Sequence, residues 1–298
     1  MVIHNCQGIS MQYASFRRPD GRSTFGRREG SRILDCGATS GRGGRAHATD
    51  LRAAIAAGAL AELEAEHSFA LAEITLLPVI PAPGKILCVG LNYEAHRKET
   101  GRAQAGHPAI FVRFSDTLVA HGQSILKPAI SSELDYEGEL AVIIGKAGRA
   151  IPRARALDHV AGYSCFNDAS VRDWQRHNIQ FTPGKNFPAT GAFGPWLTTP
   201  DSVGDPQRLR ILTRLNGEIV QDESTGAMIW PVAELIEYLS AFTPLAPGDV
   251  IATGTPAGVG SRRAPPLWMK PGDRIEVDIG PVGCLVNPIA QEPERAAS

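Results

Sequence analysis

The middle of the chain contains the run Asp135-Tyr136-Glu137-Gly138-Glu139-Leu140-Ala141-Val142-Ile143-Ile144-Gly145. Every residue from 140 to 144 is apolar, which is typical of a strand buried on both faces. Carboxylates stand at positions 135, 137 and 139, and they share one face because side chains alternate along a strand. An unpaired anion inside a protein is very costly, so these acids need a compensating partner.

Two kinds of partner remain open for these carboxylates. A hard divalent cation fits, because Mg²⁺ and Mn²⁺ prefer oxygen ligands and the two glutamates offer two carboxylates. The plainer interpretation is a polar entrance to the strand, where the acids are solvated or paired with arginines. Spacing alone does not decide between them, since Glu-x-Glu is common in strands.

The composition of the 298 residues indicates a globular protein with a sizeable core, because 43% of them are hydrophobic. A net charge of -1 without basic blocks argues against a nucleic-acid partner. The five cysteines are scattered and form no C-x-x-C pair, which favours free thiols in a reducing compartment. No apolar run reaches the length of a membrane span and no secretory signal is visible, so we expect a cytoplasmic protein with no membrane partner.

A proline-rich segment, residues 74–84, separates a small N-terminal part from a larger body. The small part is predicted to be an α+β domain, with strands near 12–16 and 31–35 and an amphipathic helix over 51–63. The predicted divisions are a disordered N-terminal extension at 1–10, the small domain at 11–80, the catalytic body at 81–290 and a disordered tail at 291–298.

The body is predicted to be β-dominated, because short strands alternate with Pro-Gly turns and helices are few. Asn216-Gly217 predicts a tight hairpin, and the periodicity over 232–242 predicts an amphipathic helix. A further helix is expected over 152–160. The fold class is therefore α+β with a predominance of strands.

The glycine-rich segment 37–44 suggests a second class of function, a nicotinamide-dependent dehydrogenase. The strand before it is neither long nor strongly apolar, and no βαβ units with a ribose-binding acid follow at the required distance. A surface loop is the better interpretation.

Several polar residues outside the central run are candidates for chemistry. Asp168 ends an apolar strand and is either a third oxygen ligand or the N-cap of a helix over 169–176. His96 and Glu99 are i,i+3 neighbours on a predicted helix, which suits a general base and the carboxylate that orients it. The alternative is that His96 and Glu99 form an ordinary ion pair on the surface.

Other candidates would contact a substrate. Lys185, in a loop rich in glycine and proline, would stabilise an enolate or carboxylate, unless it is simply solvated. Arg172 and Gln175 would bind a substrate carboxylate or carbonyl. Thr255 lies in a Gly-rich loop over 253–260 that lacks the Lys-Ser/Thr ending of a P-loop, so it suits a carboxylate better than a nucleotide phosphate. Three phenylalanines form either an apolar wall for a bulky substituent or part of the core: Phe181, Phe187 and Phe193.

Taken in order, these motifs resemble the fumarylacetoacetate hydrolase family, in its branch of acylpyruvases and 2-oxo acid hydrolases and decarboxylases. The resemblance covers about residues 85–289, with a weaker similarity over 11–80. The matching motifs are Val89-Gly90-Leu91-Asn92-Tyr93-x-x-His96-x-x-Glu99, Asp135-Tyr136-Glu137-x-Glu139-Leu140, Asn167-Asp168 with Arg172-Asp173-Trp174-Gln175, Gly184-Lys185, Thr253-Gly254-Thr255-Pro256-x-Gly258-Val259-Gly260 and Pro271-Gly272-Asp273.

The resemblance implies a mixed β-sandwich roll with a small N-terminal domain, assembled as a homodimer. It implies Mg²⁺ or Mn²⁺ held by Glu137, Glu139 and Asp168, and a lid that carries His96 and Glu99. Further active-site positions of the family match two more candidates, Lys185 and Thr255. Asp135 matches no metal position of the family, so we expect it to be a supporting residue.

The expected function is metal-dependent hydrolysis of a C–C bond in a β-diketo or acylpyruvate-type acid, through a metal-bound enolate. Decarboxylation of an oxaloacetate-type 2-oxo acid, or isomerisation or hydration of an intermediate of aromatic catabolism, is the alternative, because the same site would stabilise the same enolate. A non-enzymatic binding protein is the rival from another class; it predicts no metal in the purified protein.

Overall fold

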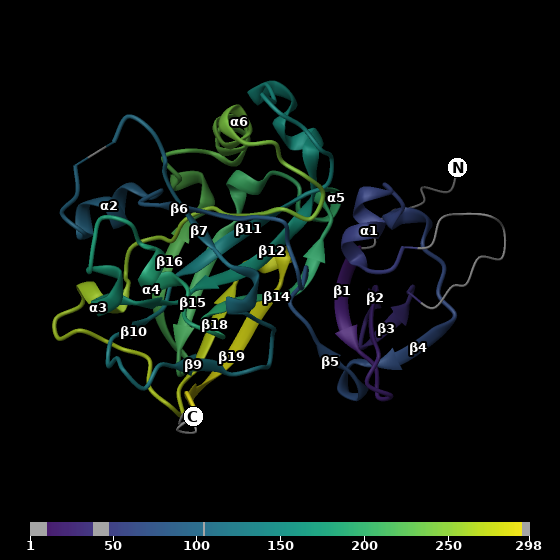
Figure 1. Ribbon diagram of the computed structural model, residues 1–298, viewed down its shortest axis with the longest axis horizontal. Helices are drawn as coiled ribbons and strands as arrows, with labels where there is room; N and C mark the ends of the chain where they lie inside the picture. Colours follow the sequence, from purple (N-terminus) through teal and green to yellow (C-terminus); the bar gives the residue numbers. More distant parts are fainter. Residues whose placement is uncertain (1–10, 38–47, 104, 294–298) are drawn as a thin grey trace, which may run out of the picture.

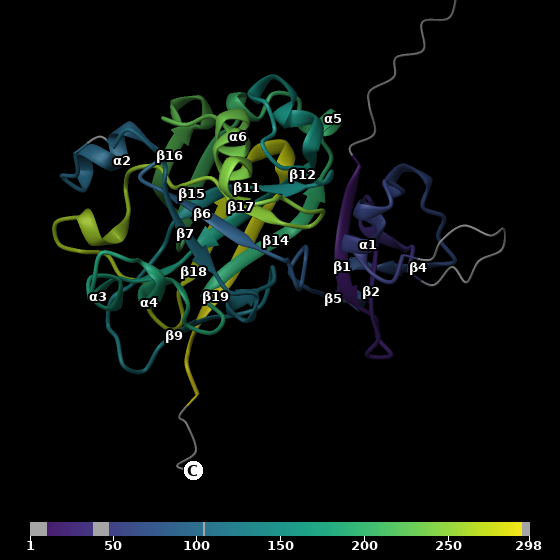
Figure 2. The same cartoon turned by 45° about the horizontal axis from the view of Figure 1, so that its top comes forward.

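The computed structural model describes residues 11–37, 48–103 and 105–293 (Figure 1). The predicted extension at 1–10, most of the glycine-rich loop and the end of the tail lie outside these ranges. Residues 11–80 stand beside a larger body, with strand β1 facing it, and the same arrangement is visible after a turn of the molecule (Figure 2). In the described residues, no helix combines the length and apolar character needed to cross a membrane.

The N-terminal part is an antiparallel sheet that carries one α-helix. Its elements are β1 (Gln12–Arg17), β2 (Ser23–Glu29), β3 (Arg32–Asp35), α1 (Leu51–Ala56), β4 (His67–Ala70) and β5 (Thr75–Leu76). The sequence did not predict β2, and the helix predicted over 51–63 ends at Ala56. Gly58 adopts φ +64, a left-handed conformation that stops a helix, and a 3₁₀ turn (Leu60–Glu62) follows it.

One long sheet connects the N-terminal part to the body. β1 pairs with β14 (Gly191–Thr198), and the order continues through β12 (Val160–Asp168), β11 (Gly138–Ile144), β17 (Val250–Ala252), β6 (Ile86–Gly90) and β7 (Ala109–Arg113). Short β8 (Leu118–Val119) pairs with β14. All seven residues of β11 are buried, as its apolar sequence predicted.

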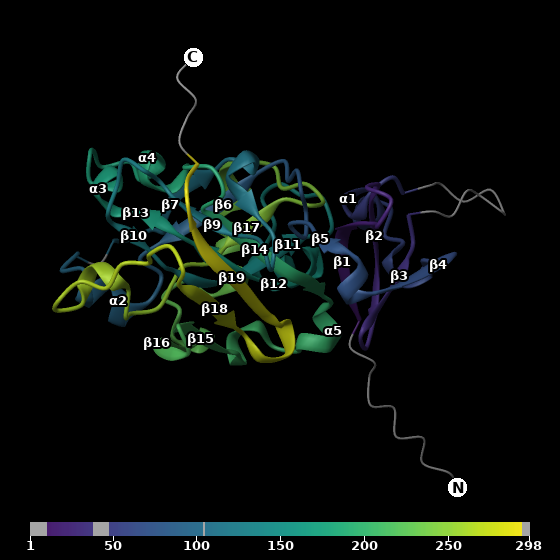
Figure 3. The ribbon, with the colours of Figure 1, turned by 90° about the horizontal axis from the view of Figure 1, so that it is seen from below.

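A second sheet packs against the first and closes the core. It consists of β16 (Glu218–Ser224), β15 (Arg210–Leu215), β18 (Arg274–Asp278), β19 (Cys284–Gln291) and β9 (Ile125–Lys127). Figure 3 shows β18 and β19 side by side across the body. Asn216-Gly217 forms the predicted hairpin turn, with both residues at positive φ. β19 continues through Gln291, a residue that the sequence placed in the tail.

Helices cover the margins of the two sheets. Helix α6 (Val232–Phe242) was predicted within its observed bounds, and it buries Leu235, Ile236 and Leu239. The helix expected over 152–160 is a 3₁₀ segment (Arg153–His159) that packs against α6. The short helices are α2 (Glu94–Glu99), α3 (Arg172–Gln175), α4 (Thr182–Lys185) and α5 (Pro200–Val203). Strands dominate this α+β architecture, as the sequence predicted.

The central run of the sequence does not form one continuous strand. Leu134 and Asp135 form β10, which pairs with β13 (Ser170–Val171), and β11 begins only at Gly138. Backbone N–H groups of Gly260 and Ser261 bind the Asp135 carboxylate and draw it away from the line of β11. The prediction that three carboxylates share one face of a single strand is therefore wrong, because Asp135 belongs to β10, Glu137 precedes β11 and only Glu139 lies on β11.

Candidate active site

Three buried carboxylates meet where β11 begins and β12 ends. Glu139 lies on β11, Asp168 is the last residue of β12, and Glu137 stands just before β11 and accepts a backbone hydrogen bond from Asp168. One oxygen from each carboxylate lies within 4.8 Å of the others. Asp168 is not a helix cap, because α3 begins at Arg172 with Val171 in the N-cap position. The structure thus brings together the three residues that the sequence proposed as metal ligands.

The surroundings push the pKa values of the two glutamates in opposite directions. Burial, followed by the neighbouring charges of Asp168 and Glu137, raises the pKa of Glu139 well above its usual range. At Glu137 burial acts in the same direction, but Lys185 and Arg172 outweigh it and bring the pKa to about 2. Of the two glutamates, Glu139 is therefore the one whose charge the protein compensates less.

This donor set fits a hard divalent cation. Three carboxylates offer the oxygen ligands that Mg²⁺ and Mn²⁺ prefer, and their oxygens converge on one point. The raised pKa of Glu139 shows that further positive charge here would be favourable. The plainer interpretation, acids that are solvated or paired with arginines, holds in part. The three side chains are buried and not solvated, but Arg172 pairs with Glu137 and Arg113 pairs with Asp168.

Three buried cations contact the triad directly: Lys185, Arg113 and Arg172. Lys185, the last residue of α4, places Nζ 2.6 Å from Glu137 Oε2 and 2.6 Å from Asp168 Oδ2. Arg113 at the end of β7 places Nε 2.7 Å from Asp168 Oδ1. Lys185 was predicted from the sequence as a site residue, whereas Arg113 was not. A charged residue that directly follows the apolar run 109–112 was the signal available.

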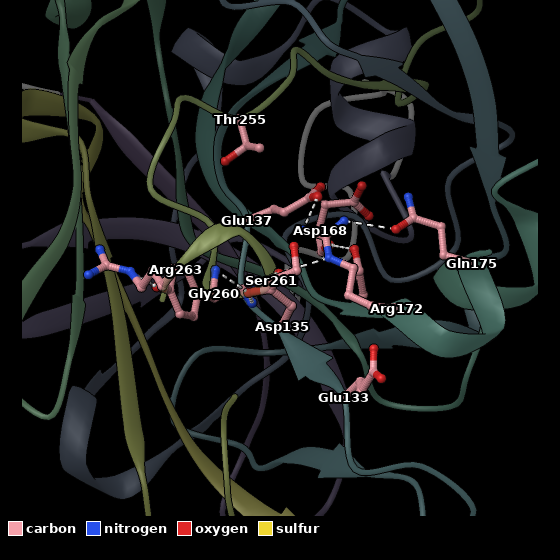
Figure 4. Close-up of polar contacts among 12 residues, drawn as sticks. Glu133, Asp135, Glu137, Asp168, Arg172, Gln175, Thr255, Gly260, Ser261 and Arg263 are labelled. Atoms are coloured by element: carbon pink, nitrogen blue, oxygen red, sulfur yellow. Dashed lines mark hydrogen bonds and ion pairs between the residues drawn. The ribbon is translucent and has the colours of Figure 1, made fainter. Parts of the chain in front are cut away.

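Arg172 joins the triad to a supporting residue, as Figure 4 shows. Its guanidinium lies 2.7 Å from Glu137 Oε1, donates from Nε to Asp135 Oδ2 at 2.8 Å and donates from Nη1 to Gln175 Oε1 at 2.8 Å. Asp135 also accepts from the backbone of Gly260 and Ser261. Asp135 thus lies behind Arg172, in the supporting place that the sequence predicted.

His96 and Glu99 form a fixed pair on α2. His96 Nδ1 lies 3.0 Å from Glu99 Oε2, and Gly258 N donates to Glu99 Oε1 at 2.9 Å. His96 is only 5% exposed, so the pair is not an ordinary surface ion pair. Because Nδ1 faces Glu99, Nε2 is the nitrogen that can exchange a proton with a bound molecule.

The glycine-rich loop at 253–260 serves the triad itself. Gly254 N donates to Glu139 Oε2 at 2.8 Å. The Thr255 hydroxyl donates to Gly138 O and accepts from Gln221 Nε2, a residue that the sequence analysis missed. Thr255 faces the cavity, but its hydroxyl hydrogen is committed to the backbone.

A cavity of about 620 Å³ opens above the triad. Seven of the predicted site residues line it: His96, Glu137, Glu139, Arg172, Gln175, Lys185 and Thr255. Asp168 and Glu99 lie behind this lining and contact it through Lys185 and His96. Of the three phenylalanines only Phe181 lines the cavity; Phe193 packs against Phe166 in the core, and Phe187 packs on Trp174.

The rest of the cavity wall is rich in positive charge. Arg102, Arg176 and Arg262 line it and are exposed to solvent. Arg102 stacks on the ring of Phe181, and Arg176 pairs with Glu133. Arginine binds carboxylates well, so this wall favours an anionic ligand.

Comparison with known proteins agrees with this geometry. The family model for the fumarylacetoacetate (FAA) hydrolase C-terminal domain matches residues 85–290. The mitochondrial oxaloacetate tautomerase FAHD2A of Bos taurus is 42% identical over 219 residues, which cover 73% of this chain and 70% of that protein. Oxaloacetate tautomerase YisK of Bacillus subtilis is 43% identical over 225 residues, which cover 74% of this chain and 75% of that protein.

The fold has solved relatives as well. A fumarylacetoacetate hydrolase from Exiguobacterium antarcticum superposes with a TM-score of 0.82 at 35% identity, covering 95% of this chain and 100% of the other. The names of these relatives describe enzymes with different reactions, a tautomerase and a hydrolase, on one architecture. Sequence, fold and site geometry agree, and the chain belongs to the fumarylacetoacetate hydrolase family of enzymes.

Proposed function

We propose that this protein catalyses metal-dependent proton transfer beside the 2-oxo group of a small dicarboxylic acid, the keto–enol tautomerisation of an oxaloacetate-type substrate. The observation that carries this proposal is that His96, held by Glu99, faces a cavity lined by Glu137 and Glu139 of the acid triad. Relatives that are 42% and 43% identical and are named oxaloacetate tautomerases support it.

Glu137, Glu139 and Asp168 would hold Mg²⁺ or Mn²⁺. When bound, the cation supplies Lewis-acid polarisation of the 2-oxo carbonyl. Compensation of a developing negative charge in a site of low dielectric is often the largest single contribution to catalysis.

His96 then acts as the proton carrier. Its Nε2 accepts a proton from the carbon next to the carbonyl and returns one to the carbonyl oxygen, so substrate and product differ only in the position of one hydrogen. Glu99 keeps Nδ1 protonated and stabilises the imidazolium between the two steps. Gly258 fixes Glu99 from the other side.

The cations around the triad orient the acid. Lys185 and Arg172 face the cavity beside Glu137 and bind negative charge on the reacting end. The arginines of the outer wall, Arg102, Arg176 and Arg262, suit the second carboxylate of a dicarboxylic acid. This charge favours a small dianion over an uncharged aromatic substituent.

Hydrolysis of a C–C bond in an acylpyruvate is the second candidate. His96 Nε2 would equally activate a water molecule, and a fumarylacetoacetate hydrolase shares the fold at 35% identity. Both reactions form an enolate, so the acid triad and its cations do not distinguish tautomerisation from hydrolysis. A homodimer, which the family resemblance implies, belongs to this proposal too, and light scattering during size-exclusion chromatography measures it.

The proposal is tested by following enol-oxaloacetate and acetylpyruvate by ultraviolet absorbance with Mn²⁺ or with EDTA. We expect Mn²⁺-dependent ketonisation of enol-oxaloacetate, reduced about 10²–10⁴-fold in His96→Gln, and no cleavage of acetylpyruvate. Glu94→Gln, on the exposed side of the same helix, is the matched control and keeps full activity. Metal-independent turnover, or two acids formed from acetylpyruvate, would reject the tautomerase.

A further inference from the structure

Arg113 is a buried cation for which the proposed reaction has no direct use. It ends the edge strand β7, yet its side chain is 0% exposed. Arginine is almost never fully buried unless it is paired, and breaking a buried pair by removing one partner is strongly destabilising. The groups around this side chain therefore indicate its role.

The guanidinium holds both the carboxylate of Asp168 and the backbone that follows it. Nε lies 2.7 Å from Asp168 Oδ1, and Nη2 donates to the carbonyl of Ala169 at 2.7 Å. Nη2 also donates to Thr190 Oγ1 at 3.1 Å. Because Lys185 contacts the other carboxylate oxygen, both oxygens of Asp168 are fixed in direction.

The opposite strand leaves room for this arrangement. Gly191 on β14 is the register partner of Asp168, and a Cβ atom at this position would lie 2.6 Å from Arg113 Nη1. Any larger residue here would push the guanidinium from its place. The missing side chain of Gly191 is thus matched to the buried arginine.

We infer that Arg113 is a positioning residue that fixes the Asp168 carboxylate for a divalent cation. The inference rests on the proposed metal site. Two effects of Arg113 on metal affinity have opposite signs: its charge repels a cation, whereas a fixed ligand costs less to organise. Orientation outweighs repulsion, since loss of a partner that orients a metal ligand typically weakens affinity about 10–100-fold.

Titration of Mn²⁺ by electron paramagnetic resonance, which counts free ions and needs no turnover, tests this inference. Arg113→Lys keeps the positive charge but loses the planar set of guanidinium N–H donors. We expect this variant to bind Mn²⁺ about tenfold more weakly than wild type. Arg113→Met removes both, and we expect a loss of about 10–100-fold. Gly191→Ala leaves every charge in place and should weaken binding by moving the guanidinium.

Arg18→Lys is the matched control, because Arg18 pairs with the buried Asp35 in the N-terminal part, away from the triad. It should leave the Kd for Mn²⁺ unchanged. Wild-type affinity in Arg113→Lys, or tighter binding in Arg113→Met, would overturn the inference while leaving the metal site intact. If wild type itself binds no Mn²⁺, the proposed function and this inference both fail. Should Arg113→Met not fold, Arg113→Lys and Gly191→Ala decide the question.

Discussion

Glu137 and Glu139 are two positions apart, yet one has a pKa of about 2 and the other a pKa well above the normal carboxyl range. The difference comes from their neighbours, because Lys185 and Arg172 both contact Glu137, whereas a backbone N–H of Gly254 binds Glu139. Both glutamates are buried, so the difference between their pKa values comes from contact with cations.

This difference predicts how stability depends on pH without metal. A carboxyl whose pKa is raised by folding binds its proton more tightly in the folded state. The stability it contributes is full below the unfolded pKa and is lost as pH rises through the folded one. In EDTA, the free energy of unfolding of wild type should therefore fall with rising pH more than that of Glu139→Gln. Urea unfolding over a pH series measures this, and parallel curves would contradict it. Mn²⁺ binding should strengthen with pH, since the ligands must be ionised.

Residue types and spacing singled out most of the site residues as candidates, and the family resemblance assigned their roles. The Glu-x-Glu pattern, the acid at the end of an apolar strand and the His–Glu spacing each report local chemistry, and the structure places these residues around one cavity. Arg113 and Gln221 were missed because their partners lie far away in sequence. Only the folded structure shows that Arg113 at the end of β7 contacts Asp168 at the end of β12, because these two strands are not neighbours in the sheet.

At the scale of elements, the loop 253–260 binds both Glu99 of the His96–Glu99 pair and Glu139 of the triad. Gly258 adopts φ +101 and a Cβ there would lie 2.2 Å from Val220 O, while its N–H holds Glu99. Gly258→Ala should destabilise the protein by about 1–3 kcal/mol, the usual cost of backbone strain. It should also lower kcat, because Glu99 loses its hydrogen bond to the Gly258 N–H. Urea unfolding and steady-state kinetics measure the two effects.

Gly272→Ala provides the control for this substitution. Gly272 has a similar φ of +94, but a Cβ there would meet nothing within 4 Å. We expect this variant to lose stability through strain and to keep its kcat. Equal losses of kcat in both variants would show that the hydrogen bond to Glu99 is unimportant.

The sequence predicted whether a segment is a helix or a strand where its hydrophobic pattern is strong. It did not predict where these elements begin and end. Helix α6 and strand β11 follow from their apolar patterns. The run from 135 to 145 looked continuous because nothing in it reveals that distant backbone groups at 260 and 261 bind Asp135. The helix at 51–63 was overextended because a single glycine, Gly58, ends it through its left-handed backbone.

At the scale of the whole molecule, one hydrophobic cluster joins the N-terminal part to the body. Leu51 on α1 is fully buried in a cluster that includes Phe166, Phe193 and Val250 of the body. Leu51→Ala should destabilise the protein by about 2–5 kcal/mol. All four tryptophans lie in the body, but Trp196 contacts Arg28 of the N-terminal part. Fluorescence during urea unfolding in a Trp196→Phe background therefore reports whether the body is destabilised too.

Independent domains would give a different result. The fluorescence midpoint would then stay at the wild-type value while circular dichroism showed a second, earlier transition. Leu157→Ala, at a position 43% exposed, serves as the control and should change little. The sequence suggested a boundary near residue 80 from its prolines, but the pairing of β1 with β14 could not be seen, since pairing between distant strands leaves no local pattern.

The buried acids and cations of this site also restrict how the protein can evolve. Asp168 pairs with Arg113, and Glu137 pairs with Arg172. Loss of one partner leaves a buried charge and costs about 3–5 kcal/mol, a large share of the total of about 5–15 kcal/mol that keeps a protein folded. A lineage that abandoned the reaction would have to replace an acid together with its arginine, so inactive descendants should be recognisable by losses that come in pairs.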